Sequence, residues 1–329
     1  MPATPHDPPP VQRPLREAVA WSELARPMLV VATGRDAVAF VDRFTTASLA
    51  AIAVGHGTET VFCDARGHVL ALALVLRTAD GLEIDAGRSA RVSLLDHLEH
   101  HHIREQLELR DASLEHVTFL VAGPTAANWL AERLGVAVPH VGDHVTSAVG
   151  STAVQVIRTG RFGPAAFLLR VAADDAAAVR QWLSDTGLSR ADADAVETVR
   201  IEERTPEAAD LPEKTLPQEL ELPPGAISFT KGCYLGQETV ARLDALGHVN
   251  RVLSVVACDG GTPPAAGAIL LADGAPVGTI TSSCPAPSGA ASLGLALVHR
   301  RAAEPTARLT IEGRRAWLEA ARTASGGRG

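Results

Sequence analysis

The sequence is poor in cysteine and in aromatic residues. Its 329 residues include four cysteines, Cys63, Cys233, Cys258 and Cys284, and a single tyrosine, Tyr234. None of the cysteines forms a C-x-x-C pair, which argues against a zinc ribbon, a ferredoxin-type cluster motif and a disulfide scaffold. Thiols that are scattered in this way fit a reducing compartment, and we expect a cytoplasmic protein.

Long apolar runs are also missing. The longest, Val69–Leu76, is far shorter than the roughly 20 residues that a membrane helix needs, so we expect no membrane partner. Residues 1–14 have no apolar core, which predicts that no signal peptide precedes the first domain. The net charge of −8 makes direct binding of nucleic acid an unfavoured function.

Local patterns divide the chain into tails, an α+β region and a small β-rich region. Residues 1–24 are rich in proline, and we assign them to a disordered tail, although Pro14–Ala25 could start a short helix. Residues 25–250 contain two successive strand–turn–strand–helix cycles, which predict two α+β subdomains. Short β runs and glycine turns predict a small antiparallel barrel or sandwich over 251–321, and 322–329 is a tail.

The expected elements follow from apolar periodicity and turn residues. Strands are expected at 28–32, 61–63, 68–76, 82–85, 106–110, 114–122, 153–158, 165–171 and 226–229, and helices at 36–44, 88–102, 125–134, 174–185, 192–203 and from 237 onward.

The stretch Ala226–Arg242 brings several reactive side chains into one loop. It contains the string KGCYLGQE, which begins at Lys231 and ends at Glu238. A neighbouring ammonium and the start of a helix both favour a thiolate, and would lower the pKa of Cys233 from ~8.5. Cys233 and Lys231 are therefore candidate catalytic residues. From the residues alone, a buried structural cysteine is an equally good interpretation.

The same string closely resembles the signature of the YgfZ family, folate-binding proteins related to the glycine-cleavage T-protein (aminomethyltransferase) and to mitochondrial iron–sulfur assembly factors. The resemblance runs from about Met28 to about Leu318 and is strongest over Val196–Arg251. It implies an α+β fold with T-protein-like N-terminal folate-binding domains and a small C-terminal antiparallel β-barrel. These domains would be arranged as a ring around a folate-sized hole, in a monomer.

The resemblance also implies ligand-binding residues. Arg200-Ile201-Glu202 resembles an R-x-E segment of the T-proteins, whose glutamate binds the pterin ring. Glu202 and Arg200 would then bind tetrahydrofolate or a one-carbon derivative, and Tyr234, Gln237 and Glu238 of the signature are assigned to the same ligand. A solvated charge at the end of a helix is the alternative interpretation of Glu202.

Three functions are compatible with these residues. The first is a folate-binding accessory protein that supports iron–sulfur cluster assembly or repair, and through iron–sulfur enzymes tRNA modification. Its partners would be iron–sulfur proteins or their assembly factors. The second is a tetrahydrofolate-dependent aminomethyl or one-carbon transferase of the T-protein type. T-proteins carry an aspartate in a T-N-D segment, where this chain has Thr46-Ala47-Ser48. The missing carboxylate at Ser48 and the complete KGCYLGQE string both count against this second function. The third is a non-catalytic partner-binding module, so the residues leave open whether the protein is an enzyme.

A cluster of histidines lies near the end of the helix expected at 88–102. His97 and His101 have the i, i+4 spacing of zinc ligands, and His100 and His102 adjoin them. The HEXXH order is missing, and histidines at a helix C-terminus are favoured by the helix dipole. We therefore expect no metal site.

Overall fold

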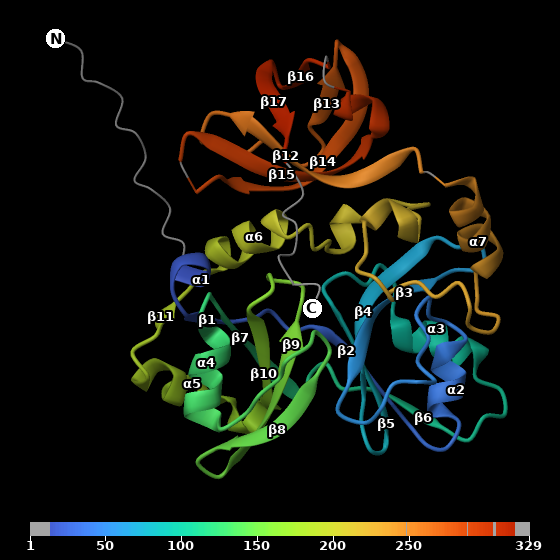
Figure 1. Cartoon of the computed structure of the whole chain (residues 1–329), viewed down its shortest axis with the longest axis vertical. Helices are drawn as coiled ribbons and strands as arrows, with labels where there is room; N and C mark the ends of the chain where they lie inside the picture. Colours follow the sequence, from blue (N-terminus) through green and yellow to red (C-terminus); the bar gives the residue numbers. More distant parts are fainter. Residues whose placement is uncertain (1–13, 248, 288, 305–306, 320–329) are drawn as a thin grey trace.

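The computed structural model describes residues 14–247, 249–287, 289–304 and 307–319. The chain forms two α+β units and a closed β-barrel (Figure 1). The two α+β units lie side by side, and the barrel lies above them in this view, with helix α6 and the segment after it in between. The expected α+β class and C-terminal barrel are confirmed. Most of the two expected tails lies outside the described residues.

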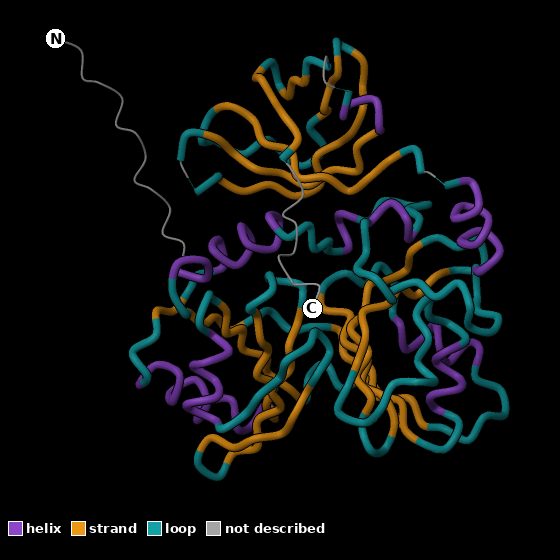
Figure 2. Tube along the Cα trace, in the orientation of Figure 1, coloured by secondary structure: helices purple, strands orange, loops and turns teal. Residues whose placement is uncertain are grey.

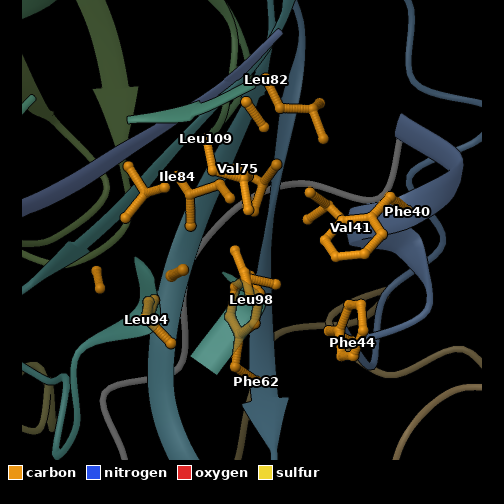
Figure 3. Close-up of a cluster of buried hydrophobic side chains, with 14 of the residues drawn as sticks. Phe40, Val41, Phe44, Phe62, Val75, Leu82, Ile84, Leu94, Leu98 and Leu109 are labelled. Atoms are coloured by element: carbon orange, nitrogen blue, oxygen red, sulfur yellow. The ribbon is translucent and has the colours of Figure 1, made fainter. Parts of the chain in front are cut away.

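The first α+β unit is an antiparallel sheet with helices on one face. Its strands, in spatial order, are β3 (Gly57–Cys63), β4 (Val69–Arg77), β5 (Gly81–Gly87), β2 (Met28–Thr33) and β6 (Glu108–Asp111). Two helices cover this sheet, α2 (Ala37–Asp42) and α3 (Leu94–His101). Phe40 of α2 and Leu98 of α3 pack against Phe62 and Val75 of the strands (Figure 3). Strand side chains alternate between the two faces of a sheet, so one face presents apolar residues to the helices. Contacts in this apolar layer hold the helices against the sheet.

The second α+β unit is a six-stranded sheet. Its spatial order is β11 (Ser189–Arg190), β1 (Ala20–Glu23), β7 (His116–Ala122), β10 (Ala166–Ala172), β9 (Thr152–Thr159) and β8 (His144–Val149). The β1 and β11 strands are parallel, whereas the other neighbours are antiparallel. Helices α4 (Ala126–Leu134) and α5 (Ala176–Asp185) complete the unit, and its core contains Trp21, Phe119 and Phe167.

The short connection between β6 and β7, residues 112–115, links the two sheets. The sequence pattern shows a strand on either side of this connection, as in a hairpin. In the structure β6 pairs with β2, whereas β7 pairs with β1 and β10. A hairpin and a connection between two sheets have the same strand–turn–strand sequence pattern. The tertiary structure is therefore needed to distinguish the two arrangements.

The structure corrects the assignment of residues 1–24 to a tail. Residues 14–23 form α1 (Pro14–Glu17) and β1, and β1 is an inner strand of the six-stranded sheet. Leu15 and Trp21 are only 3% and 1% exposed. A strand of four residues next to a proline-rich segment has no local signal of its own, because its hydrogen bonds come from distant strands.

The long connection between the second α+β unit and the barrel begins with α6 (Ala193–Glu202). Asp192 caps this helix, because its side chain accepts a hydrogen bond from the backbone N–H of Ala195. The chain then makes two 3-10 turns, at Ala208–Asp210 and Pro217–Leu220, joined by loops (Figure 2). The strand expected at 226–229 does not form, and α7 (Gln237–Leu246) follows.

The C-terminal unit is a closed six-stranded barrel. Around the barrel the strands are β12 (Arg251–Asp259), β15 (Ala291–His299), β14 (Ala275–Pro285), β13 (Ile269–Ala272), β16 (Leu309–Ile311) and β17 (Arg314–Leu318). Side chains of β12 alternate: Val256 and Cys258 belong to one apolar cluster, and Leu253 and Val255 to another that includes Ile201 of α6. One strand therefore serves both the barrel core and the contact with the rest of the chain. Within the described residues, no helix has the length and apolar character that a membrane crossing requires.

Candidate functional site

A cavity of about 1380 Å³ lies between the two α+β units. Residues of β1, β4 and β5 form part of its wall, and the turn at 160–163 between β9 and β10, α6 and the segment after α6 form the rest. No described residue of the barrel lines it. A large cavity is therefore present, but the N-terminal region and the segment after α6 enclose it, and the barrel does not take part as the implied ring of domains would require.

Glu202, the last residue of α6, lies in the wall of this cavity. Its Oε2 accepts a hydrogen bond from Nε of Arg16 at 3.0 Å, and its side chain is 10% exposed. Nη2 of Arg16 also donates to Oε1 of Glu203 at 2.5 Å. Carboxylates are disfavoured at the C-terminal end of a helix, and Arg16 offsets that cost. Sequence reasoning missed Arg16, because it placed this residue in the tail.

Arg200 also lies in the cavity wall, but its guanidinium group is hydrogen-bonded to carboxylates of the same chain. Nε and Nη2 donate to the carboxylate of Glu197 at 2.7 and 2.6 Å, and Nη1 donates to Asp210 at 2.8 Å. Burial alone would lower the pKa of Arg200, but Glu197 and Asp210 outweigh burial and raise it. Asp210 in turn accepts hydrogen bonds from Thr281 and Ser282 of β14. Arg200 therefore joins α6 to the barrel, and a direct contact with a ligand stays a prediction.

Lys231 is held by the last residue of α2 and the segment that follows it. Its Nζ donates to the backbone oxygens of Asp42, Thr45 and Ala47 at 2.6, 3.0 and 2.7 Å, and lies 3.1 Å from Oδ1 of Asp42. The side chain is 2% exposed. Burial lowers the pKa of Lys231, and the hydrogen bond that Lys231 donates to Asp42 acts in the opposite direction. These contacts attach the loop to the first α+β unit, and a catalytic role of Lys231 stays a prediction.

Cys233 is exposed, whereas Cys63, Cys258 and Cys284 are buried. Burial raises the pKa of Cys63 to about 12 and that of Cys284 to about 11, so both are thiols at neutral pH. Of the four cysteines, Cys233 is therefore the one that a partner or a reagent can reach.

Two glycines bring the Cys233 loop against a turn of the first α+β unit. Gly236 precedes α7 with φ of 82°, and a Cβ there would lie 2.6 Å from the oxygen of Asp64 and 2.7 Å from Cα of Gly67. Leu235 N donates to the oxygen of Arg43 at 2.9 Å. Gly236 is required here, because any side chain would clash with this backbone and would also need an unfavourable φ.

The other signature residues lie around this junction. Tyr234 is buried, and burial raises its pKa to about 12. Oε1 of Gln237 accepts from Tyr234 N at 3.3 Å, and Glu238 is exposed. Neither these three residues nor Cys233 belongs to the described lining of the cavity. The structure thus brings Arg200 and Glu202 together in the cavity, and the signature residues together in a separate loop.

The cavity wall also contains a buried carboxylate that has no sequence motif. Asp85 of β5 is bound by Arg161, whose Nη1 donates to its Oδ1 at 2.9 Å, and by Arg170. Burial alone would raise the pKa of Asp85, but the two arginines outweigh burial and lower it. Positions this far apart in the chain give no local signal, so sequence reasoning could not pair them.

The segment Thr46-Ala47-Ser48 lies against the Cys233 loop and not in the cavity lining. Oγ1 of Thr46 donates to the oxygen of Ala226 at 2.6 Å. A missing carboxylate at Ser48 therefore says little about chemistry inside the cavity.

The histidine cluster packs as aromatic rings. His97 and His101 lie 5.1 Å apart between ring centroids, and His97 contacts the ring of Phe44 at 5.8 Å. Burial, helped by the charges of His101 and His100, lowers the pKa of His97 to about 4. In the part of the chain that the structure describes, no group of three or more His, Cys, Asp or Glu side chains is placed to hold a metal ion.

Comparisons with known proteins agree with this architecture. One similar protein is the aminomethyltransferase of Saccharopolyspora erythraea, 26% identical over 91% of this chain and 83% of that protein. Another is the tRNA-modifying protein YgfZ of Vibrio vulnificus, 28% identical over 73% of this chain and 74% of that protein. A chloroplast protein of Arabidopsis thaliana named as a transferase is 25% identical, and this chain spans only 63% of its length.

A solved structure shows the same fold. The glycine cleavage system aminomethyltransferase T from Bartonella henselae superposes with a TM-score of 0.77 over 93% of this chain and 86% of that one, at 19% identity. Residues 251–325 match the glycine cleavage T-protein C-terminal barrel domain. Residues 12–231, well over half of the chain, match the GCVT N-terminal domain, and the chain therefore belongs to this T-protein family.

Proposed function

We propose that the protein binds tetrahydrofolate or a one-carbon derivative in its cavity, and that it supports the assembly or repair of iron–sulfur proteins through the Cys233 loop. One observation carries the proposal. The chain has a ligand-sized cavity with Glu202 in its wall, and an exposed cysteine on a firmly held loop outside that cavity.

The cavity suits a ligand of this size and chemistry. Pockets for small molecules typically measure about 300–1,000 Å³, so 1380 Å³ leaves room for a pteridine, an aminobenzoyl group and a glutamate. A carboxylate such as that of Glu202 can accept two parallel hydrogen bonds from an amino-pyrimidine edge. Arg16 orients this carboxylate in the wall.

The loop suits contact with another molecule. Cys233 is exposed, and the contacts of Lys231 and Gly236 hold its neighbours against the first α+β unit. A thiol in this position is accessible to a partner without entry into the cavity. Relatives of the protein include proteins named as tRNA-modifying. These names agree with the proposal that the protein supports iron–sulfur enzymes that modify tRNA.

The second candidate is a tetrahydrofolate-dependent one-carbon transferase. Relatives that are named aminomethyltransferase favour it. The place of Ser48 outside the cavity lining also removes one argument against it. The third candidate is a non-catalytic module, in which folate serves to order the cavity. Turnover of a folate substrate supports the second candidate, and a functional Cys233 without turnover supports the first.

Calorimetric titration with tetrahydrofolate tests the cavity. Wild type should bind, and Glu202→Ala should weaken binding by about 1–3 kcal/mol, the value of a charge-assisted contact. Glu221→Ala is a matched control, because Glu221 lines the same cavity but is 49% exposed and paired with Arg204. Wild-type protein that binds no tetrahydrofolate at millimolar concentration would contradict the proposal.

A cellular assay tests the loop. Cys233→Ala should fold and bind tetrahydrofolate like wild type, yet fail to restore iron–sulfur enzyme activity in a strain that lacks the protein. The reason is that the exposed thiol contributes reactivity rather than packing. Normal iron–sulfur enzyme activity with Cys233→Ala would remove the thiol from the function.

A further inference from the structure

Glu59 of β3 places a carboxyl group in the cavity wall without an ion-pair partner in the described part of the chain. The residue lines the cavity, and its Oε1 is buried with no hydrogen-bond partner among the described residues. The turn at Gly160 lies close by, since a Cβ on Gly160 would be 3.2 Å from this oxygen. Buried polar atoms without a partner are rare in folded proteins, so this one requires an explanation.

Two other carboxylates in the cavity wall, Asp85 and Glu202, are paired with arginines, unlike that of Glu59. Arg161 is the cation nearest in the chain to Gly160, but its Nη1 and Nη2 donate to Asp85 at 2.9 and 2.5 Å. Glu202 is bound by Arg16. Burial raises the pKa of Glu59, against the weaker effects of Arg161 and the amide of Gly160. The wall thus has a carboxyl group with one oxygen, Oε1, that accepts no hydrogen bond from the described part of the chain.

We propose that Glu59 is a ligand-binding residue of the cavity, and that its carboxyl group accepts a hydrogen bond from an N–H group of a bound pteridine ring. This inference rests on the proposed folate function and goes beyond it, because Glu59 belongs to no recognised motif. The terminal torsion of a glutamate is broad, so either oxygen can turn toward the cavity.

The chemistry favours the ring over the glutamate tail of such a ligand. A reduced pteridine carries several N–H donors, whereas the tail ends in carboxylates that would repel an ionised Glu59. A ring N–H that reaches the carboxyl group satisfies an oxygen that otherwise has no partner. Binding then favours the ionised form of Glu59, which the empty cavity disfavours.

The test compares three variants with wild type by calorimetric titration with tetrahydrofolate. Glu59→Leu removes the acceptor and should raise the Kd roughly tenfold or more. Glu59→Gln keeps an acceptor but no charge, and should have a smaller effect. Glu221→Gln is the control in the same wall, and its Kd should equal that of wild type. Thermal unfolding of each variant confirms that it is folded.

Two further measurements separate ligand contact from a structural role. The ratio of the Glu59→Leu and wild-type Kd values should shrink as pH falls from about 8 to about 5, because a protonated carboxyl group no longer offers the charged acceptor. Titration with p-aminobenzoylglutamate, which lacks the pteridine, should be the same for both proteins. Equal Kd values of wild type and Glu59→Leu for tetrahydrofolate would overturn the inference alone, whereas a wild type that does not bind would overturn the folate function and this inference together.

Discussion

Lys231 and Asp42 are 189 positions apart in the sequence, yet the ammonium of Lys231 donates to the backbone oxygen of Asp42 at 2.6 Å and lies 3.1 Å from its carboxylate. Oδ1 of Asp42 also accepts from Leu49 N at 2.6 Å. Asp42 therefore both fixes the conformation of the segment after α2 and attaches the signature loop to this segment.

Lys231→Met should destabilise the protein by about 3–5 kcal/mol, since removal of one member of a buried pair leaves the other without its partner. Three backbone oxygens also lose their donor. Urea denaturation measures the loss of unfolding free energy. The control is Lys214→Met, because Lys214 is exposed, and its effect should be within about 0.5 kcal/mol. Equal stability of the two variants would refute the role given to Lys231.

The stability of the protein should respond differently to a methyl group at each of two glycines of the signature loop. Gly236→Ala should cost about 1–3 kcal/mol, because its Cβ would lie 2.6 Å from the oxygen of Asp64 at a φ of 82°. Gly232→Ala should be close to neutral, since no atom other than those of its chain neighbours lies within 4 Å of the added Cβ. Thermal unfolding of the two variants is the comparison, and similar melting temperatures would contradict the close packing of the loop.

The four thiols should differ sharply in reactivity. A thiol reagent should modify Cys233 rapidly in the native protein, and the three buried cysteines only after unfolding. The raised pKa values of Cys63 and Cys284, about 12 and about 11, add to their protection at neutral pH. Mass spectrometry after native labelling identifies the site. Cys233→Ser should abolish the fast reaction, and a fast reaction that persists would place the reactive thiol elsewhere.

Replacement of Glu59 should stabilise the ligand-free protein in a pH-dependent way. The folded state raises the pKa of Glu59 above its ordinary value of 4.5, so the folded chain binds this proton more tightly than the unfolded chain. As pH rises above 4.5, wild type loses stability relative to Glu59→Gln, until the pKa of the folded state is passed. Near neutral pH the variant should be more stable by about 1–3 kcal/mol. Urea denaturation over a pH series would show a constant difference if burial did not affect this carboxyl group.

Much of the local structure could be predicted from the sequence. The spacing of apolar residues indicated α2 and α4, and Gly135 ends α4 in the left-handed conformation that such a glycine favours. The strand run at 68–76 and the barrel strands were also expected. Two predictions were wrong: residues 226–229 form no strand, and residues 14–23 form a short helix and a sheet strand instead of a tail. In both cases the result depends on distant partners.

The fold class, the barrel and the signature loop could be inferred from the amino-acid sequence, because periodicity, turn residues and a contiguous string are all local properties. The surroundings of each site residue depend on tertiary contacts. The tertiary structure placed Arg16 on Glu202, directed Lys231 to Asp42 instead of a neighbour in the loop, and left Glu59 in a cavity wall with an unsatisfied oxygen. Such contacts join residues that are far apart in the chain, and the energy of a buried charge depends on what the fold places around it.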